Sequence, residues 1–270
     1  MWNENDKEPI AQFLALTFLI AWVSEAMLIA GEWLGIITGT VGSVVAFIII
    51  GFGAGLAPTY AIIILLKKHG QIRGFKDVCR HIFKTENVFE TIIITAVFFG
   101  SQLILNIISN DYTGSWYFAL LGIPIMIIGG GMEELGWRGF LQPALEEKMP
   151  FVAATFIIGI IWTVWHLPLW LIQNANQSSM NILAFFAHCV TFGFVLAALY
   201  KLTKSVFACV LLHAWSNALG TSFTLDFLTN TPDMKLIMVY ILEIAIAIII
   251  CLIADKTKNS QNHTAGRRVC

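Results

Sequence analysis

Residues 119–140 read ALLGIPIMIIGGGMEELGWRGF, an apolar run that ends in two adjacent glutamates and an arginine. This stretch belongs to an apolar segment over about 116–137, close to the roughly 20 residues that a helix needs to cross a bilayer core. Ionisable side chains at such depth are costly to insert, and packing does not require them. The stretch therefore predicts a membrane-spanning helix with a functional site near its end.

Composition extends this prediction to the whole chain. Of its 270 residues, 57% are hydrophobic and 12% are charged, with a mean hydropathy of +0.77, whereas a soluble domain carries about 25% charged residues. A lipid environment requires backbones that satisfy their own hydrogen bonds, and the runs lack the short alternating pattern of a barrel. The sequence therefore predicts an all-α, polytopic membrane protein. The net charge of -1 gives no sign of a nucleic-acid partner.

Eight apolar runs are long enough to be spans. They cover about residues 10–31, 42–66, 88–108, 116–137, 151–172, 181–200, 205–223 and 235–254. The loop KKHGQIRGFKDVCRHIFK, residues 67–84, is rich in Lys and Arg and is expected in the cytoplasm. With eight spans and both termini cytoplasmic, fifteen of the sixteen Lys and Arg residues lie on that side. We predict one integral membrane domain over 1–270, an eight-helix bundle in which the first span is a retained anchor.

The first polar cluster contains Glu133, Glu134 and Arg138. On a helix, Glu134 and Arg138 are four residues apart and can form a salt bridge, while Glu133 points about 100° away. Glu134 is therefore expected to stay charged, and Glu133 to accept and return protons. A simple charge cluster at a span end would explain Arg138 but not two buried acids.

The second cluster lies in the next span, where Trp162 and His166 are four residues apart. Glu133 precedes the turn near Met149 and Pro150 by about as many residues as His166 follows it. In an antiparallel hairpin the two side chains would lie at the same depth. We expect them to face each other.

The third cluster is His213 and Asn217, which share one helix face. An imidazole and an amide can donate hydrogen bonds to a developing oxyanion, or the imidazole can bind a metal. The alternative is that they only join helices by hydrogen bonds. His188, Glu25 and Glu243 are single polar residues in other spans; no role is assigned to them, although each acid could bond a neighbouring helix.

The three clusters together resemble the CPBP family of intramembrane proteases, also called the Abi or type II CaaX prenyl endopeptidase family. The resemblance covers a core region of about 115–220 and rests on Glu133, Glu134 and Arg138, then Trp162 and His166, then His213 and Asn217. The family's second motif commonly opens with Phe, and Trp162 takes that place here.

The resemblance implies an endopeptidase that cuts near the C-terminus of prenylated or other membrane-associated peptides. Glu133 and His166 would activate a water, and His213 and Asn217 would stabilise the oxyanion. Glu134, Arg138 and Trp162 would be supporting residues. The implied partners are a prenylated or lipidated CaaX-like peptide and membrane lipid, and the implied location is a bacterial cell membrane with the active site facing the cytoplasm.

Three alternatives remain open. A zinc-dependent form of the same protease would bind its metal through Glu133, His166 and His213; we favour no metal, because the Asn217 amide suits an oxyanion hole better than a zinc shell. A non-catalytic immunity or peptide-binding protein would keep the cavity without the reaction. A proton-coupled transporter is disfavoured, because its inverted repeats are missing and the polar residues gather in one half of the spans.

Overall fold

The computed structural model describes residues 9–109, 116–220, 228 and 234–266, and every regular element in these ranges is helical. The longer helices are α1 (Pro9–Trp33), α2 (Gly39–Ile48), α3 (Ala57–Lys68), α5 (Val88–Ser109), α6 (Phe118–Ile128), α9 (Phe151–Trp165), α10 (Ile182–Thr203), α11 (Val206–Leu219) and α13 (Met234–Gly266). Shorter segments are α4 (Phe75–Ile82), α7 (Glu134–Gly136) and α8 (Gln142–Glu146), the 3-10 helices η2 (Gly131–Glu133), η4 (Leu167–Leu171) and η5 (Asn176–Ser179), and the π-helices η1 (Ile49–Gly55) and η3 (Trp137–Leu141). The predicted all-α class is confirmed.

The number of spans depends on how the bent and short helices are counted. Within the described ranges six helices are long and apolar enough to cross a membrane, or seven if α6 and the bent segment after it form one span. The remaining predicted run, over 205–223, contains α11, which has 14 residues. The chain is thus a multi-pass membrane protein, while the count of eight and the cytoplasmic termini stay predictions.

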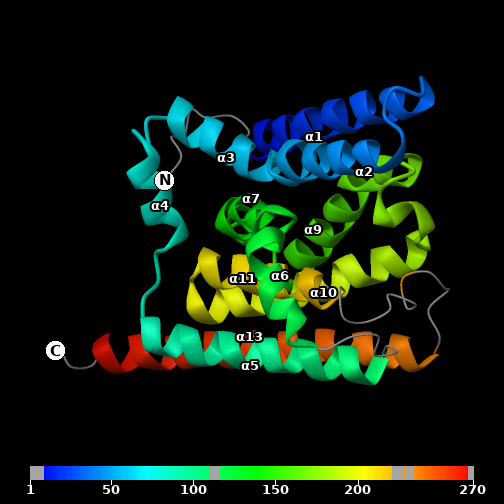
Figure 1. Ribbon diagram of the computed structural model, residues 1–270. Coiled ribbons are helices and arrows are strands. Elements are labelled where there is room, and N and C mark those ends of the chain that lie inside the picture. Colours follow the sequence, from blue (N-terminus) through cyan, green and yellow to red (C-terminus); the bar gives the residue numbers. More distant parts are fainter. Residues whose placement is uncertain (1–8, 110–115, 221–227, 229–233, 267–270) are drawn as a thin grey trace.

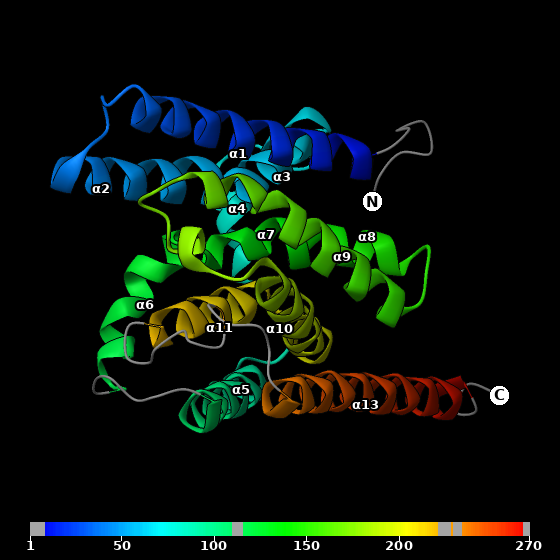
Figure 2. The same cartoon turned by 90° about the vertical axis from the view of Figure 1, so that its right-hand side faces the viewer.

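The helices form three layers (Figures 1 and 2). One outer layer contains α1 with α2 and α3, and the other contains α5 and α13. Between them lie α6, α7, α9, α10 and α11, with α10 packed on α9 and α13, and α11 packed on α5 and α6. The outer helices present apolar side chains outward, such as Met27, Ile104 and Ile241. The middle layer is therefore shielded from lipid on two sides.

The predicted helix over about 116–137 is broken. Its first part, α6, contains Pro124 and ends at Ile128; the segment from Gly131 onward departs at an angle of 46°. Gly130 has a φ of 155°, a backbone conformation that residues with a Cβ rarely adopt. The break turns the two glutamates away from the α6 axis and into the middle layer, as Figure 1 shows for α7.

A glycine-rich run, residues 51–55, precedes Pro58. It forms the π-helix η1, and α3 starts just after it. On the facing segment, a Cβ added at Gly136 would lie 2.6 Å from Cβ of Pro58 and 2.8 Å from the Phe13 ring. The short α7 thus packs directly on α3 and α1, which fixes the height of the glutamates.

Candidate active site

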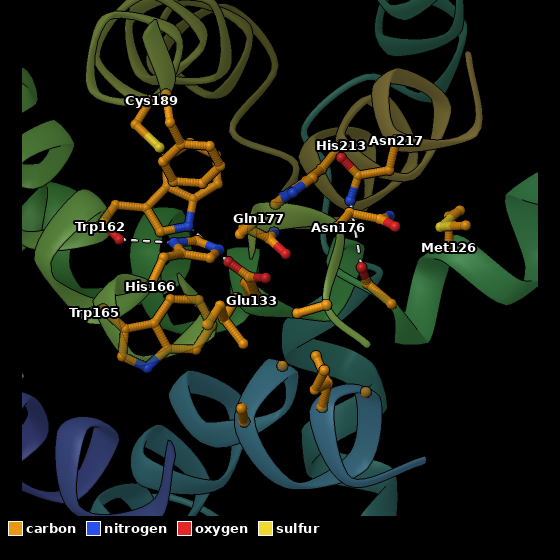
Figure 3. A pocket seen from close by; sticks show the side chains of 18 of the residues that line it. Met126, Glu133, Trp162, Trp165, His166, Asn176, Gln177, Cys189, His213 and Asn217 are labelled. Atoms are coloured by element: carbon orange, nitrogen blue, oxygen red, sulfur yellow. Dashed lines mark hydrogen bonds between the residues drawn. The ribbon is translucent and has the colours of Figure 1, made fainter. Parts of the chain in front are cut away.

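A cavity of about 260 Å³ lies between the middle layer and the outer layer that contains α1 and α2 (Figure 3). All four side chains with predicted catalytic roles line it: Glu133, His166, His213 and Asn217. They come from η2, the end of α9, and α11, which are far apart in the sequence. The structure thus brings residues of the three clusters to one cavity, and their catalytic roles stay predictions.

Two indole groups hold the Glu133 carboxylate. Its Oε2 accepts hydrogen bonds from Nε1 of Trp162 at 2.8 Å and from Nε1 of Trp137 at 3.2 Å. In the described part of the chain, no donor reaches its Oε1. Trp162 was expected to be a supporting residue, and Trp137 was not singled out, although it lies four residues after Glu133. One carboxylate oxygen is therefore fixed while the other remains available.

His166 caps the end of α9, and its Nδ1 lies 2.8 Å from the carbonyl oxygen of Trp162. A carbonyl oxygen can only accept, so Nδ1 carries the hydrogen and Nε2 of the neutral ring keeps its lone pair. Figure 3 shows this ring beside Glu133, in agreement with the expectation that the two residues reach the same depth.

Glu134 is fully buried, and its carboxylate contacts both Arg138 and His213. The predicted salt bridge is present, with Arg138 Nη1 lying 3.0 Å from Oε2 of Glu134. Its Oε1 lies 2.8 Å from Nδ1 of His213, a contact between residues 79 positions apart. Arg138 also donates through Nη2 to the carbonyl oxygen of Gly193 at 3.1 Å. A carboxylate oxygen accepts, so Nδ1 of His213 carries a hydrogen, and the contact turns Nε2 of the ring toward Gly130.

His213 and Asn217 converge on the helix break. Asn217 donates through Nδ2 to the carbonyl oxygen of Gly129 at 3.3 Å. A Cβ added at Gly130 would clash with Nδ2 of Asn217 and would lie 3.0 Å from Nε2 of His213. Because Gly130 has no side chain, these two nitrogen atoms can lie next to each other.

Other polar residues reach the cavity from the loop after α9. Asn176 and Gln177 of η5 line it and point inward in Figure 3. Glu32 of α1 holds this loop, because its carboxylate accepts from the backbone N–H of Gln173 and from Nδ2 of Asn174, each at 2.8 Å. Sequence reasoning missed these residues; the polar stretch NANQSS between two spans was the available signal.

The unassigned residues have different surroundings. His188 and Glu25 line the cavity. Glu243 lies instead on a neighbouring cavity of about 240 Å³, where its Oε1 accepts from Nε2 of Gln102 at 3.0 Å. The expected bond to a neighbouring helix is confirmed for Glu243 but not for Glu25.

The metal question is not decided by this geometry. Among the residues that are described, no three His, Cys, Asp or Glu side chains are arranged to hold a metal ion. The metal-free mechanism stays a prediction, and the zinc alternative remains to be tested.

The chain is thus a multi-pass helical protein with carboxylate, imidazole and amide groups gathered in one internal cavity. Residues 114–219, which carry all three motifs, match the family model described as type II CAAX prenyl endopeptidase Rce1-like. The chain is also 24% identical over 216 residues to CAAX prenyl protease 2 of Methanococcus maripaludis, an alignment that covers 72% of this chain and 78% of that protein. These findings confirm the resemblance to the type II CaaX prenyl endopeptidases and support a peptidase.

Proposed function

We propose that the protein is an intramembrane endopeptidase that cuts prenylated or similarly lipidated CaaX-like peptides near their C-terminus. The observation that carries this proposal is the division of the cavity into acceptors and donors. Oε1 of Glu133 and Nε2 of His166 offer lone pairs, whereas Nδ2 of Asn217 and Nε2 of His213 lie together beside Gly130 and are the proposed donors. Peptide hydrolysis needs both, because a water must lose a proton while the carbonyl oxygen gains charge.

In the proposed reaction, a water donates hydrogen bonds to Glu133 and to His166. Glu133 takes a proton as the water oxygen attacks the scissile carbonyl carbon, and His166 orients the water. The resulting oxyanion accepts hydrogen bonds from Nε2 of His213 and Nδ2 of Asn217. The C–N bond then breaks, and Glu133 returns the proton to the leaving amine. For Nε2 to donate in this way, the His213 ring carries both of its ring protons, with Nδ1–H directed at Glu134.

We further propose that the site lies near the cytoplasmic face. The basic α4 packs beside the start of α11, where the rings of Phe83 and Phe207 are 4.7 Å apart. Nε2 of His81 lies 3.5 Å from where a Cβ of Gly139 would be. His213 follows Phe207 by six residues, a distance of about 9 Å along a helix. The proposed location in a bacterial cell membrane rests on the family resemblance alone.

The test is cleavage of a fluorogenic farnesylated CaaX peptide by the purified full chain in detergent. Glu133→Gln should lower turnover by about 10²- to 10⁴-fold, the usual contribution of a general base. Glu243→Gln is the matched control, because it removes a half-buried acid that lies on the neighbouring cavity. Turnover by Glu133→Gln at the wild-type rate would refute the assignment. A parallel sample with a chelator separates the mechanisms, since loss of activity that zinc restores would favour the metal-dependent form.

If the folded wild type binds the peptide without cutting it, the non-catalytic alternative is favoured. In that case Glu133→Gln should leave peptide binding unchanged.

A further inference from the structure

Glu25 is an unexplained carboxyl in the wall of the candidate active site. It belongs to the buried stripe of α1, has 1% of its surface exposed, and lines the same cavity as Glu133 and His166. Its Oε2 is buried, and no hydrogen-bond partner reaches this atom from the residues that the structure describes. Burial of a carboxyl in an apolar span without a partner is costly, so packing does not account for it.

Other acids of the helix bundle show that the fold provides donors where a carboxyl is structural. Glu32, on the same stripe of α1, accepts from the loop at 173–174. Glu134 contacts Arg138 and His213, and the half-buried Glu243 accepts from Gln102. Glu25 differs from all three, because the described residues around it supply no donor to its buried Oε2.

The position of Glu25 is nevertheless well fixed. Three residues earlier in α1, Trp22 donates through Nε1 to the carbonyl oxygen of Trp165 at 3.1 Å. This bond holds α1 against the end of α9, next to His166. Nε1 of Trp165, a residue that also lines the cavity, is a second buried polar atom without a partner. The wall between α1 and α9 thus presents an acceptor and a donor that the protein itself does not use.

The charges around the cavity indicate which charge a bound ligand group should carry. No Lys or Arg appears among the described residues that line it, while Glu25 and Glu133 both do. The nearby Arg138 is engaged with Glu134 and Gly193. A ligand carboxylate would have no cation to meet at this wall, whereas a cationic group would supply the missing partner of Glu25.

We propose that Glu25 is a binding subsite for a basic side chain, Lys or Arg, of the peptide substrate. This inference rests on the proposed function, because it assumes that a peptide enters the cavity. An extended peptide advances about 3.3–3.6 Å per residue. Since Glu25 and Glu133 line one small cavity, the basic residue lies within about three positions of the scissile bond.

The test uses lipidated peptides with a ketomethylene group in place of the scissile amide, so that binding is measured without cleavage. Lys is placed in turn at each of three positions on either side of that group, and each peptide is paired with one that has norleucine there. At one position, the purified wild-type chain should bind the Lys peptide at least tenfold more tightly. Glu25→Gln should bring this ratio near one and leave binding of the norleucine peptide unchanged. The control Glu243→Gln should keep the ratio.

Two results would overturn the proposal: no Lys peptide that binds better than its norleucine partner, or a preference that persists in Glu25→Gln. The proposed function can fail separately. If the wild type prefers a Lys peptide but cleaves no peptide, the subsite is supported and the proposed reaction is not. If the wild type cleaves peptides but shows no Lys preference, the reaction is supported and the subsite is not.

Thermal unfolding distinguishes a binding residue from a structural one. Glu25→Gln should unfold at the same temperature as the wild type or higher, because it removes an unpartnered carboxyl. Glu32→Gln should unfold at a lower temperature, because it weakens the contacts to Gln173 and Asn174. A loss of stability in Glu25→Gln as large as in Glu32→Gln would assign Glu25 to the fold and contradict the subsite.

Discussion

Gly130→Ala tests the proposed oxyanion site directly. The added Cβ would overlap Nδ2 of Asn217 and lie 3.0 Å from Nε2 of His213, so both donors must move. The φ of 155° at this position adds backbone strain of about 1–3 kcal/mol for a residue with a side chain. Loss of one oxyanion donor typically costs about 10²- to 10³-fold in kcat, or about 2.7–4 kcal/mol. We expect kcat to fall by about that factor, with a much smaller change in KM.

The neighbouring glycine supplies the control. A Cβ at Gly129 would lie 3.4 Å from Sδ of Met126 and 3.5 Å from the carbonyl oxygen of Ile125, both ordinary contacts. Gly129→Ala also keeps the carbonyl group that accepts from Asn217. Steady-state cleavage of the same fluorogenic peptide should therefore separate the two variants by at least tenfold. Equal kcat values for Gly129→Ala and Gly130→Ala would refute the placement of the donors.

Three further variants probe the surroundings of the site. Trp162→Phe removes a 2.8 Å hydrogen bond to the proposed base Glu133. It should lower kcat/KM about ten- to a hundredfold, because a hydrogen bond to a charged group contributes about 1.5–3 kcal/mol. Trp215→Phe is the control, because the indole of Trp215 donates to the carbonyl oxygen of Phe99 instead. Arg138→Met leaves the Glu134 charge buried and should cost about 3–5 kcal/mol in chemical unfolding, a cost that an unchanged midpoint would contradict. In α4, burial and then the charge of Lys84 lower the pKa of His81 below its ordinary 6.5. As the pH falls, His81 therefore binds a proton in the unfolded chain before it does so in the folded chain. Stability should fall as the pH drops below about 6.5, and the stability of His81→Gln should depend less on pH in the same unfolding measurements.

Local spacing was sufficient to predict the contacts within one segment. The salt bridge between Glu134 and Arg138 follows from their separation of four residues, and so does the separate orientation of Glu133. The equal distances of Glu133 and His166 from the intervening turn were enough to place them at one cavity. Each of these predictions depends only on helical geometry and on the position of a turn.

Contacts between distant helices could not be predicted in the same way. The bond from His213 to Glu134 joins residues 79 positions apart and depends on how α11 packs against the broken segment. The sequence predicted Trp162 only as a supporting residue, because sequence shows the type of a side chain but not the direction of its N–H. The structure shows that this N–H donates to Glu133. Glu25 and Glu32 look alike in the sequence, as buried acids of one span, and only the structure separates the partnered carboxyl from the unpartnered one.

The helix break explains why three successive glycines precede the glutamates. Gly129 offers its carbonyl oxygen to Asn217, and Gly130 leaves space for the two donors. At Gly131 an added Cβ would lie 2.7 Å from the carbonyl oxygen of Val210, a backbone atom that cannot rotate away. Gly131→Ala should therefore push η2 away from α11 and lengthen the contact between Glu134 and His213. We expect a loss of turnover together with a lower unfolding temperature, whereas Gly129→Ala should show neither. Full activity of Gly131→Ala would mean that the catalytic groups do not depend on this close approach.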